Sequence, residues 1–357
     1  MQFPVRGRGA LWSAAAAAGA LFLVSCGGEG YDSAPTPRTY ATTVVVGASL
    51  SDTGNTCNLI PVGGCPPAPP YAAGRNSNGP LFVEVLAAGY GASVSPSRTG
   101  GNNFSFAGAR TGSVQAAILA APAANGIATV TVSAATGTAP SVPGMNSATG
   151  ANPSQIDALL TRFNFQIAPQ TLVIVDATTA GNNIADALAL TQAFAALPNG
   201  AANNIGPAVV TGAVTDVVTV INRLYAAGAR NILVINAPNI GQTPRVVTIG
   251  GAAPAGATAL AAGFNAGLAG QINILRSTLS GASITLFDLF ALEALIKAGT
   301  APGQPTFSNV TAACFTPTPT PVVCATPATY FYWDSFHPTA ALGAYVASRL
   351  AAAIPAP

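Results

Sequence analysis

Charged residues are scarce in this sequence: Asp, Glu, Lys and Arg make up 7% of its 357 residues, and there is a single histidine. The 13 basic side chains barely outnumber the 11 acidic ones, so no basic patch for nucleic acid is expected. Long apolar runs are also missing, because after residue 25 no uninterrupted stretch reaches the roughly 18 residues of a membrane-spanning helix. Half of the sequence is nonetheless hydrophobic, much of it alanine. These absences argue against a nucleic-acid-binding protein and against an integral membrane domain.

The N-terminus has the layout of a secretory signal. Arg6 and Arg8 precede a mostly apolar run over residues 10–24, which is too short to span a bilayer comfortably. The run ends in Leu-Val-Ser-Cys at residues 23–26, which resembles the bacterial lipobox, where a peptidase cuts before the cysteine and the thiol is acylated. The alternative is an ordinary signal peptide with an incidental cysteine at Cys26.

Lipidation of Cys26 would anchor the protein stably, because each buried methylene of an acyl chain contributes about 0.8 kcal/mol. Gly27 follows, rather than aspartate, which by analogy fits sorting to the outer membrane. Residues 27–38 are rich in Gly, Pro, Ser and Thr and are typical of a flexible tether. We therefore expect an exported, lipid-anchored protein of the cell envelope, divided into a signal peptide (1–25), a lipidated cysteine with its tether (26–40) and one globular domain (41–357).

The other four cysteines form two pairs that are close in sequence, Cys57 with Cys65 and Cys314 with Cys324. Four cysteines allow three connectivities. The local pairing is favoured because each pair brackets a Pro- or Gly-rich loop, and an exported protein meets an oxidising compartment. A zinc site is the alternative, but the spacing is wider than Cys-x-x-Cys. No metal or organic cofactor is expected.

The pattern of hydrophobic runs predicts an α/β fold. Short, β-branched apolar runs are typical of buried parallel strands, and they occupy residues 42–46, 171–175, 231–235 and 283–287. Helical patterns lie between and after them, at residues 81–88, 184–196, 208–227, 259–279, 289–298 and 339–353. This alternation predicts a three-layer α/β/α sandwich with a central, mostly parallel sheet. Residues 113–153 are either a functional excursion or a surface loop.

Three side chains in this pattern suggest a serine esterase. Ser49 follows the first strand in a tight turn, at the carboxyl edge of the sheet, where open α/β folds bind their ligands. His337 is the one histidine available to take the serine's proton. Asp334 lies three residues before it and can orient the imidazole if the chain turns. The alternative for Asp334 is to cap the helix that follows.

Six segments in order carry a resemblance to the GDSL, or SGNH, hydrolase family, over about residues 42–353. The first block, GASLSDTGN at residues 47–55, resembles the family's GDSLSDTGN, and the last, DSFHPT at residues 334–339, is similar to its DxxHPT. Between them lie matches to the GRxSNGxxWxExLA, NFAxGGA, GxND and LPxLGxTP segments, at residues 74–87, 103–109, 180–184 and 235–244.

The resemblance implies the flavodoxin-like SGNH-hydrolase fold and ester hydrolysis through an acyl-enzyme, of the esterase, lipase or lysophospholipase type. Ser49 would be the nucleophile, His337 the base and Asp334 its orienting carboxylate. The backbone amides of Ser49 and Gly108 and the side-chain amide of Asn182 would form the oxyanion hole. The expected partner is an ester substrate, with lipids among the candidates.

This chain departs from the family pattern at Ala48 and Asn183, which each replace aspartate, and at Ala107, which replaces glycine. Asn183 therefore remains an alternative to Asn182 as the oxyanion donor. The departure at Ala48 leaves the turn after the first strand without a side-chain acceptor, and we expect altered rigidity rather than inactivity. A second hypothesis is a catalytically impaired surface lipoprotein used for binding or adhesion. The intact serine, aspartate and histidine argue against it.

Overall fold

Four parallel strands form the central sheet of the computed structural model, which describes residues 40–112, 142–148, 151–195 and 205–355. They lie side by side in sequence order as β1 (Thr42–Val46), β2 (Thr171–Asp176), β3 (Asn231–Ile235) and β4 (Ser283–Phe287). All four predicted strands are confirmed, and β2 is one residue longer, ending in Asp176. The predicted signal peptide, Cys26, its tether and most of residues 113–153 lie outside the described residues.

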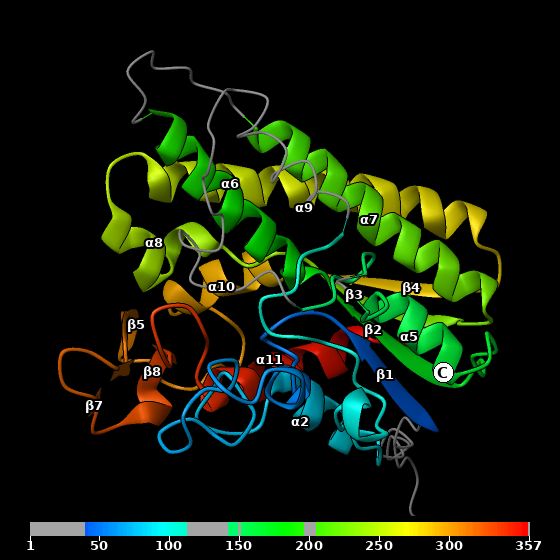
Figure 1. Ribbon diagram of the computed structural model, residues 1–357, viewed down its shortest axis with the longest axis horizontal. Coiled ribbons are helices and arrows are strands. Elements are labelled where there is room, and N and C mark those ends of the chain that lie inside the picture. The colour runs from blue at the N-terminus through cyan, green and yellow to red at the C-terminus, as the bar shows by residue number, and fades with distance from the viewer. Residues whose placement is uncertain (1–39, 113–141, 149–150, 196–204, 356–357) are drawn as a thin grey trace, which may run out of the picture. The chain divides into compact units, whose positions relative to one another are not determined.

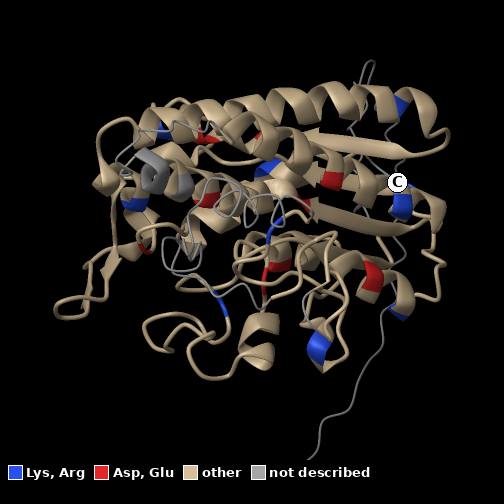
Figure 2. Ribbon diagram, turned by 45° about the horizontal axis from the view of Figure 1, so that its top comes forward, with Lys and Arg blue, Asp and Glu red and all other residues tan. Residues whose placement is uncertain are grey.

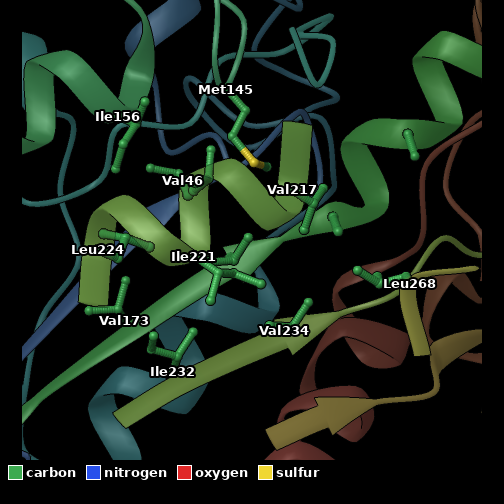
Figure 3. Packing of buried hydrophobic residues seen from close by; sticks show 14 of the residues in the cluster. Val46, Met145, Ile156, Val173, Val217, Ile221, Leu224, Ile232, Val234 and Leu268 are labelled. Carbon is green, nitrogen blue, oxygen red and sulfur yellow. The ribbon is translucent and has the colours of Figure 1, made fainter. Parts of the chain in front are cut away.

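One face of the sheet is covered by the helices α5 (Gln155–Arg162), α6 (Ala180–Ala195), α7 (Gly206–Ala226) and α9 (Ala253–Thr278) (Figure 1). Alternate strand residues such as Val173 and Val234 face this layer, and Figure 3 shows them beneath Val217 and Ile221 of α7. α7 is long and apolar enough to cross a membrane by length and composition alone. Because its apolar side chains are buried in this core, packing accounts for that composition.

The opposite face is covered by α2 (Phe82–Gly89), α10 (Leu289–Lys297) and α11 (Ala340–Ala353). The strand residues that alternate with the first set, such as Val45, Ile174 and Leu233, are buried against these helices. This period of two follows from the pleat of a strand and explains why both faces of the sheet are apolar. The predicted three-layer sandwich is therefore confirmed.

The remaining elements are short, and several of them carry the chain around the carboxyl end of the sheet. They are α1 (Asn55–Leu59), α8 (Pro244–Ile249), β5 (Asn309–Ala313), β6 (Phe315–Thr316), β7 (Val322–Val323), β8 (Tyr330–Tyr332) and the 3₁₀ helices η1 (Ser97–Thr99), η2 (Ala177–Thr179), η3 (Ile240–Gln242) and η4 (Pro327–Thr329). β5 pairs with β8 in parallel, and β6 pairs with β7 in antiparallel. Figure 2 shows basic and acidic residues interspersed among the described elements.

Both local disulfides are present. Cys57 is bonded to Cys65 in the loop after α1, and Cys314 is bonded to Cys324 across the β6–β7 hairpin. The predicted pairing is confirmed, and with it these four thiols are no longer available as zinc ligands.

Candidate active site

Ser49 lies in a tight turn at the carboxyl end of β1, and we call residues 47–52 the nucleophile turn, after the role predicted for Ser49. The carbonyl of Ala48 accepts hydrogen bonds from the amides of Ser51 (3.1 Å) and Asp52 (2.9 Å), which closes the turn around Ser49. A Cβ on Gly47 would lie 2.5 Å from Ser51 Oγ, so this position requires glycine. The serine therefore stands at the sheet edge where the sequence predicts it.

The nucleophile turn has a buried side-chain acceptor after all. Asp176, the last residue of β2, accepts a hydrogen bond from Ser51 Oγ at 2.7 Å and another from the backbone amide of Ala48. Burial raises the pKa of Asp176, and these donors oppose that rise. Gln155 of α5 binds both backbone groups of Gly47, because its side-chain amide accepts from Gly47 N (2.8 Å) and donates to Gly47 O (2.9 Å). The expectation of a turn without an acceptor is wrong, because a neighbouring strand supplies the carboxylate.

Asp52 ends the nucleophile turn and ties it to a second loop. Its buried carboxylate accepts hydrogen bonds from the amides of Gly54 (2.9 Å), Asn55 (2.6 Å) and Thr56 (3.1 Å) at the start of α1. It also accepts from the amide of Ala107 at 2.8 Å. Burial raises the pKa of Asp52 against the effect of these bonds. The SDTGN block is thus a structural clamp between the serine and residues 103–109.

Asp334 and His337 form a second unit, and we call residues 334–337 the base segment, after the role predicted for His337. His337 Nδ1 lies 2.8 Å from Asp334 Oδ2, while Asp334 Oδ1 accepts from the amides of Phe336 and His337 at 2.7 Å each. Burial alone would raise the pKa of Asp334, but the charge of His337 and these hydrogen bonds hold it below its ordinary value. The alternative that Asp334 caps the following helix is wrong, because Thr339 caps α11.

Tyr71 is a partner of the base segment that sequence reasoning missed. Its hydroxyl donates to Asp334 Oδ2 at 2.7 Å, across 263 positions of sequence. Its ring packs edge-on against Phe315 and Trp333, beside the Cys314–Cys324 disulfide. Burial and the Asp334 carboxylate raise the pKa of Tyr71, so its hydroxyl remains a donor. No local motif in the sequence marks this tyrosine.

One cleft of about 660 Å³ brings together Ser49, Gly108, Asn182 and His337, and we refer to it as the cleft. Within the described chain, no group accepts a hydrogen bond from the backbone amide of Ser49 or of Gly108. Both amides are therefore available to an anion in the cleft. Ser49 Oγ forms no hydrogen bond to His337 among these residues, and catalytic hydrogen bonds often tighten only when substrate binds.

Asn182 and its neighbour occupy different environments in the first turn of α6. Asn182 lines the cleft and donates one of its two amide hydrogens to the carbonyl of Ala109 at 2.7 Å, which leaves the second for a ligand. Asn183 is fully buried and accepts from the amide of Thr111 at 3.0 Å. The structure thus gives Asn183 a role in holding the loop and places Asn182 at the cleft.

A buried ion pair, also missed from the sequence, fixes the loop of Gly108. Arg110 binds Asp186 of α6 through two parallel hydrogen bonds of 2.7 and 2.9 Å, and both side chains are at most 3% exposed. The same guanidinium donates to the carbonyl of Gly108 at 2.6 Å. Such a fork holds its partners in a fixed geometry. The Gly108 amide is therefore oriented by α6 as well as by its own loop.

This arrangement supplies a hydroxyl, a base oriented by a carboxylate and convergent hydrogen-bond donors, which together suit acyl transfer. Among the residues that the structure describes, no group of three or more His, Cys, Asp or Glu side chains could hold a metal ion.

Comparison with known proteins agrees with this chemistry. A family model described as GDSL-like Lipase/Acylhydrolase matches residues 44–350. The matched range includes the nucleophile turn, the base segment and nearly all of the central sheet. No curated protein matches the chain.

Proposed function

This chain belongs to the GDSL-like lipase/acylhydrolase family, a membership that indicates a hydrolase of the ester type, and from that premise we propose a serine carboxylic-ester hydrolase with Ser49, His337 and Asp334 as its triad. One observation carries the proposal: the serine, the histidine bound to its aspartate and the available amides share a single cleft. None of these groups requires a cofactor.

In the proposed reaction, Ser49 Oγ attacks the ester carbonyl while the Nε2 atom of His337 takes its proton. Asp334 accepts from Nδ1, which fixes the tautomer and stabilises the imidazolium. The amides of Ser49, Gly108 and Asn182 receive the developing oxyanion, and each such donor contributes about 2.7 to 4 kcal/mol in comparable sites. His337 returns the proton to the leaving alcohol, and water then releases the acid from Ser49.

The alternative of an impaired binding or adhesion protein gains no support from the family match. The departure that motivated it, Ala48, is compensated by Asp176, which accepts from the Ala48 amide. Asn183 likewise has a structural partner in Thr111. These two departures are therefore compatible with an intact site.

Ser49→Ala tests the proposal directly. We expect kcat on p-nitrophenyl esters to fall by about 10⁴-fold or more, because the nucleophile is removed. The fold should survive, since only one hydroxyl is lost. Ser348→Ala, an exposed serine on α11, is the matched control and should retain full activity. Equal turnover by Ser49→Ala and the unmodified protein would remove Ser49 from the mechanism.

We also propose that the protein is exported and anchored at the cell envelope through a lipid on Cys26, where it meets its ester substrates. The lipobox-like residues 23–26 support this, as do two disulfides of the kind found in oxidising compartments. Cys26→Ser should move the protein from the membrane pellet to the soluble fraction. If the variant still pellets with membranes after a salt wash, the anchor lies elsewhere.

A further inference from the structure

Two hollows meet at the nucleophile. The first is the cleft described above, and the second is a smaller pocket of about 60 Å³, which we call the inner pocket. Ser49, Asn182 and Phe336 line both hollows. An ester carbonyl held between Ser49 and Asn182 therefore has one substituent directed toward each of them.

The lining of the inner pocket is mostly apolar. It includes buried side chains of α2, β8, α10 and α11, which are Phe82, Phe331, Leu289, Leu342 and Val346. Apolar walls of this kind favour a hydrocarbon group, because its transfer from water contributes about 0.8 kcal/mol per methylene. The cleft, in contrast, contains the ion pair of Arg110 and Asp186 beside apolar residues such as Ile249.

The position of the base decides which half of an ester enters which hollow. His337 lines the cleft and is absent from the lining of the inner pocket. The base that takes the proton from the serine must return it to the leaving alcohol, so that oxygen has to lie on the side of His337. The alcohol therefore belongs in the cleft, and the acyl chain is left with the inner pocket.

The size of the inner pocket limits the acyl chain. A water-sized group needs about 10 to 15 Å³ of such volume, so 60 Å³ holds roughly four to six of them. Glu293 also lines this pocket, and its carboxylate accepts from the amide of Asn239 at 3.0 Å. Burial raises the pKa of Glu293 to about 7, against the opposing charge of Lys297. A longer alkyl chain would have to pack against this carboxyl group instead of an apolar wall.

We infer that the substrates are esters of short acyl chains, of about two to six carbons, with bulky alcohols, and that the acyl chain binds in the inner pocket while the alcohol binds in the cleft. This inference rests on the proposed function. It assigns Val346, Leu289 and Phe82 to chain-length selection, although none of them belongs to the triad or the oxyanion hole.

The test is a series of p-nitrophenyl esters from acetate to dodecanoate, with kcat/KM measured for the full-length protein. We expect the highest value between two and six carbons, and a value at least about tenfold lower at eight or more. Val346→Ala enlarges the inner pocket and should move the optimum to longer chains, whereas Val346→Phe fills it and should restrict the protein to acetate. Leu289→Ala provides a second enlargement, which keeps the test decisive if Val346→Phe does not fold.

Ile249→Ala, which changes the cleft alone, is the control and should leave the acyl optimum in place whatever its effect on rate. The assignment would be overturned if Ile249→Ala moved the optimal acyl chain length and the Val346 variants left it unchanged. That result would place the acyl chain in the cleft. That outcome would leave the proposed function standing, because the esters would still be hydrolysed. If the unmodified protein hydrolysed none of the esters faster than Ser49→Ala does, the proposed function would be rejected, and this inference with it.

Discussion

The nucleophile turn and the base segment are held in place by different means. The turn is fixed by buried polar groups of the core, Asp176 at the end of β2 and Gln155 in α5. The base segment lies on a loop, where the side chain of His337 is 16% exposed. It is held by hydrogen bonds within the segment, by the hydroxyl of Tyr71 and by two backbone bonds, from Trp333 N to His337 O (2.7 Å) and from Arg245 N to Ser335 O (2.8 Å). Substitutions around the turn should therefore lower both stability and activity. Substitutions around the base segment should lower activity with little change in stability.

Among the variants that test this comparison, Asp176→Ala should have the largest effect. The substitution removes the carboxylate that accepts from Ser51 Oγ and from the amides of Thr178 and Ala48. Ser51 Oγ can still donate to Ser105 Oγ at 3.0 Å, but the two buried amides lose this acceptor, and an unsatisfied buried donor costs about 1 to 3 kcal/mol. A shift of the turn by about 1 Å would lower kcat/KM by about 10²-fold. Urea unfolding and steady-state kinetics on one short-chain ester measure the two effects.

Asp176→Asn is the matched control, because it keeps the size of the side chain and one acceptor oxygen. It should lose less on both measures. If Asp176→Ala lost activity while its free energy of unfolding stayed unchanged, the turn would not be coupled to the core as the comparison requires.

Fold prediction from the sequence succeeded where apolar runs are continuous and clearly bounded. The four strands match within one residue, because short β-branched runs bounded by turn residues allow few alternatives. α6 begins at Ala180, four residues earlier than predicted, and α9 begins at Ala253 rather than residue 259. Both starts contain Gly, Asn or Pro, whose low helix propensity was outweighed by tertiary packing. The short β5–β8 and β6–β7 pairings leave no such periodic signal.

Contacts within the candidate site could be predicted where the residues are close in sequence. Asp334 and His337 are three residues apart, and the structure joins them as expected. Asp176, Gln155 and Tyr71 were missed because each acts across more than 100 positions, so that only the folded chain brings it to its partner. Asp176 did leave one sequence signal, because it is a charged residue directly after the apolar run at residues 171–175.

Tyr71→Phe is the intermediate case and tests the base segment. Removal of the hydroxyl leaves the ring packing in place and takes one donor from Asp334 Oδ2. A hydrogen bond to a charged group contributes about 1.5 to 3 kcal/mol, so kcat should fall by about tenfold as the carboxylate loses its alignment. The freed carboxylate also stabilises the imidazolium more strongly, which should move the acid limb of the kcat/KM profile to higher pH.

The free energy of unfolding should change by less than it does in Asp176→Ala, since Tyr71 is partly exposed. Tyr330→Phe, which alters another tyrosine of the same aromatic cluster, controls for a general disturbance there and should leave the pH profile in place. An unshifted acid limb in Tyr71→Phe would show that the tyrosine only packs against the loop.

The smallest expected effect on activity is that of Ala48→Asp, which restores the family residue. Ala48 is 2% exposed and packs against Phe106, Ala109 and Val142, while its amide is already bound by Asp176. A second carboxylate would enter an apolar site beside the first, so we expect a loss of about 1 to 3 kcal/mol in unfolding free energy. Since that carboxylate carries no proton in the proposed reaction, kcat/KM should change by less than about tenfold.

Ala48→Asn is the control, because asparagine has the size of aspartate but no charge. It separates the cost of charge from the cost of volume. A gain of about a hundredfold, or roughly 2.7 kcal/mol in barrier, would mean that Asp176 does not replace the missing residue and that the native chain is a degenerate hydrolase.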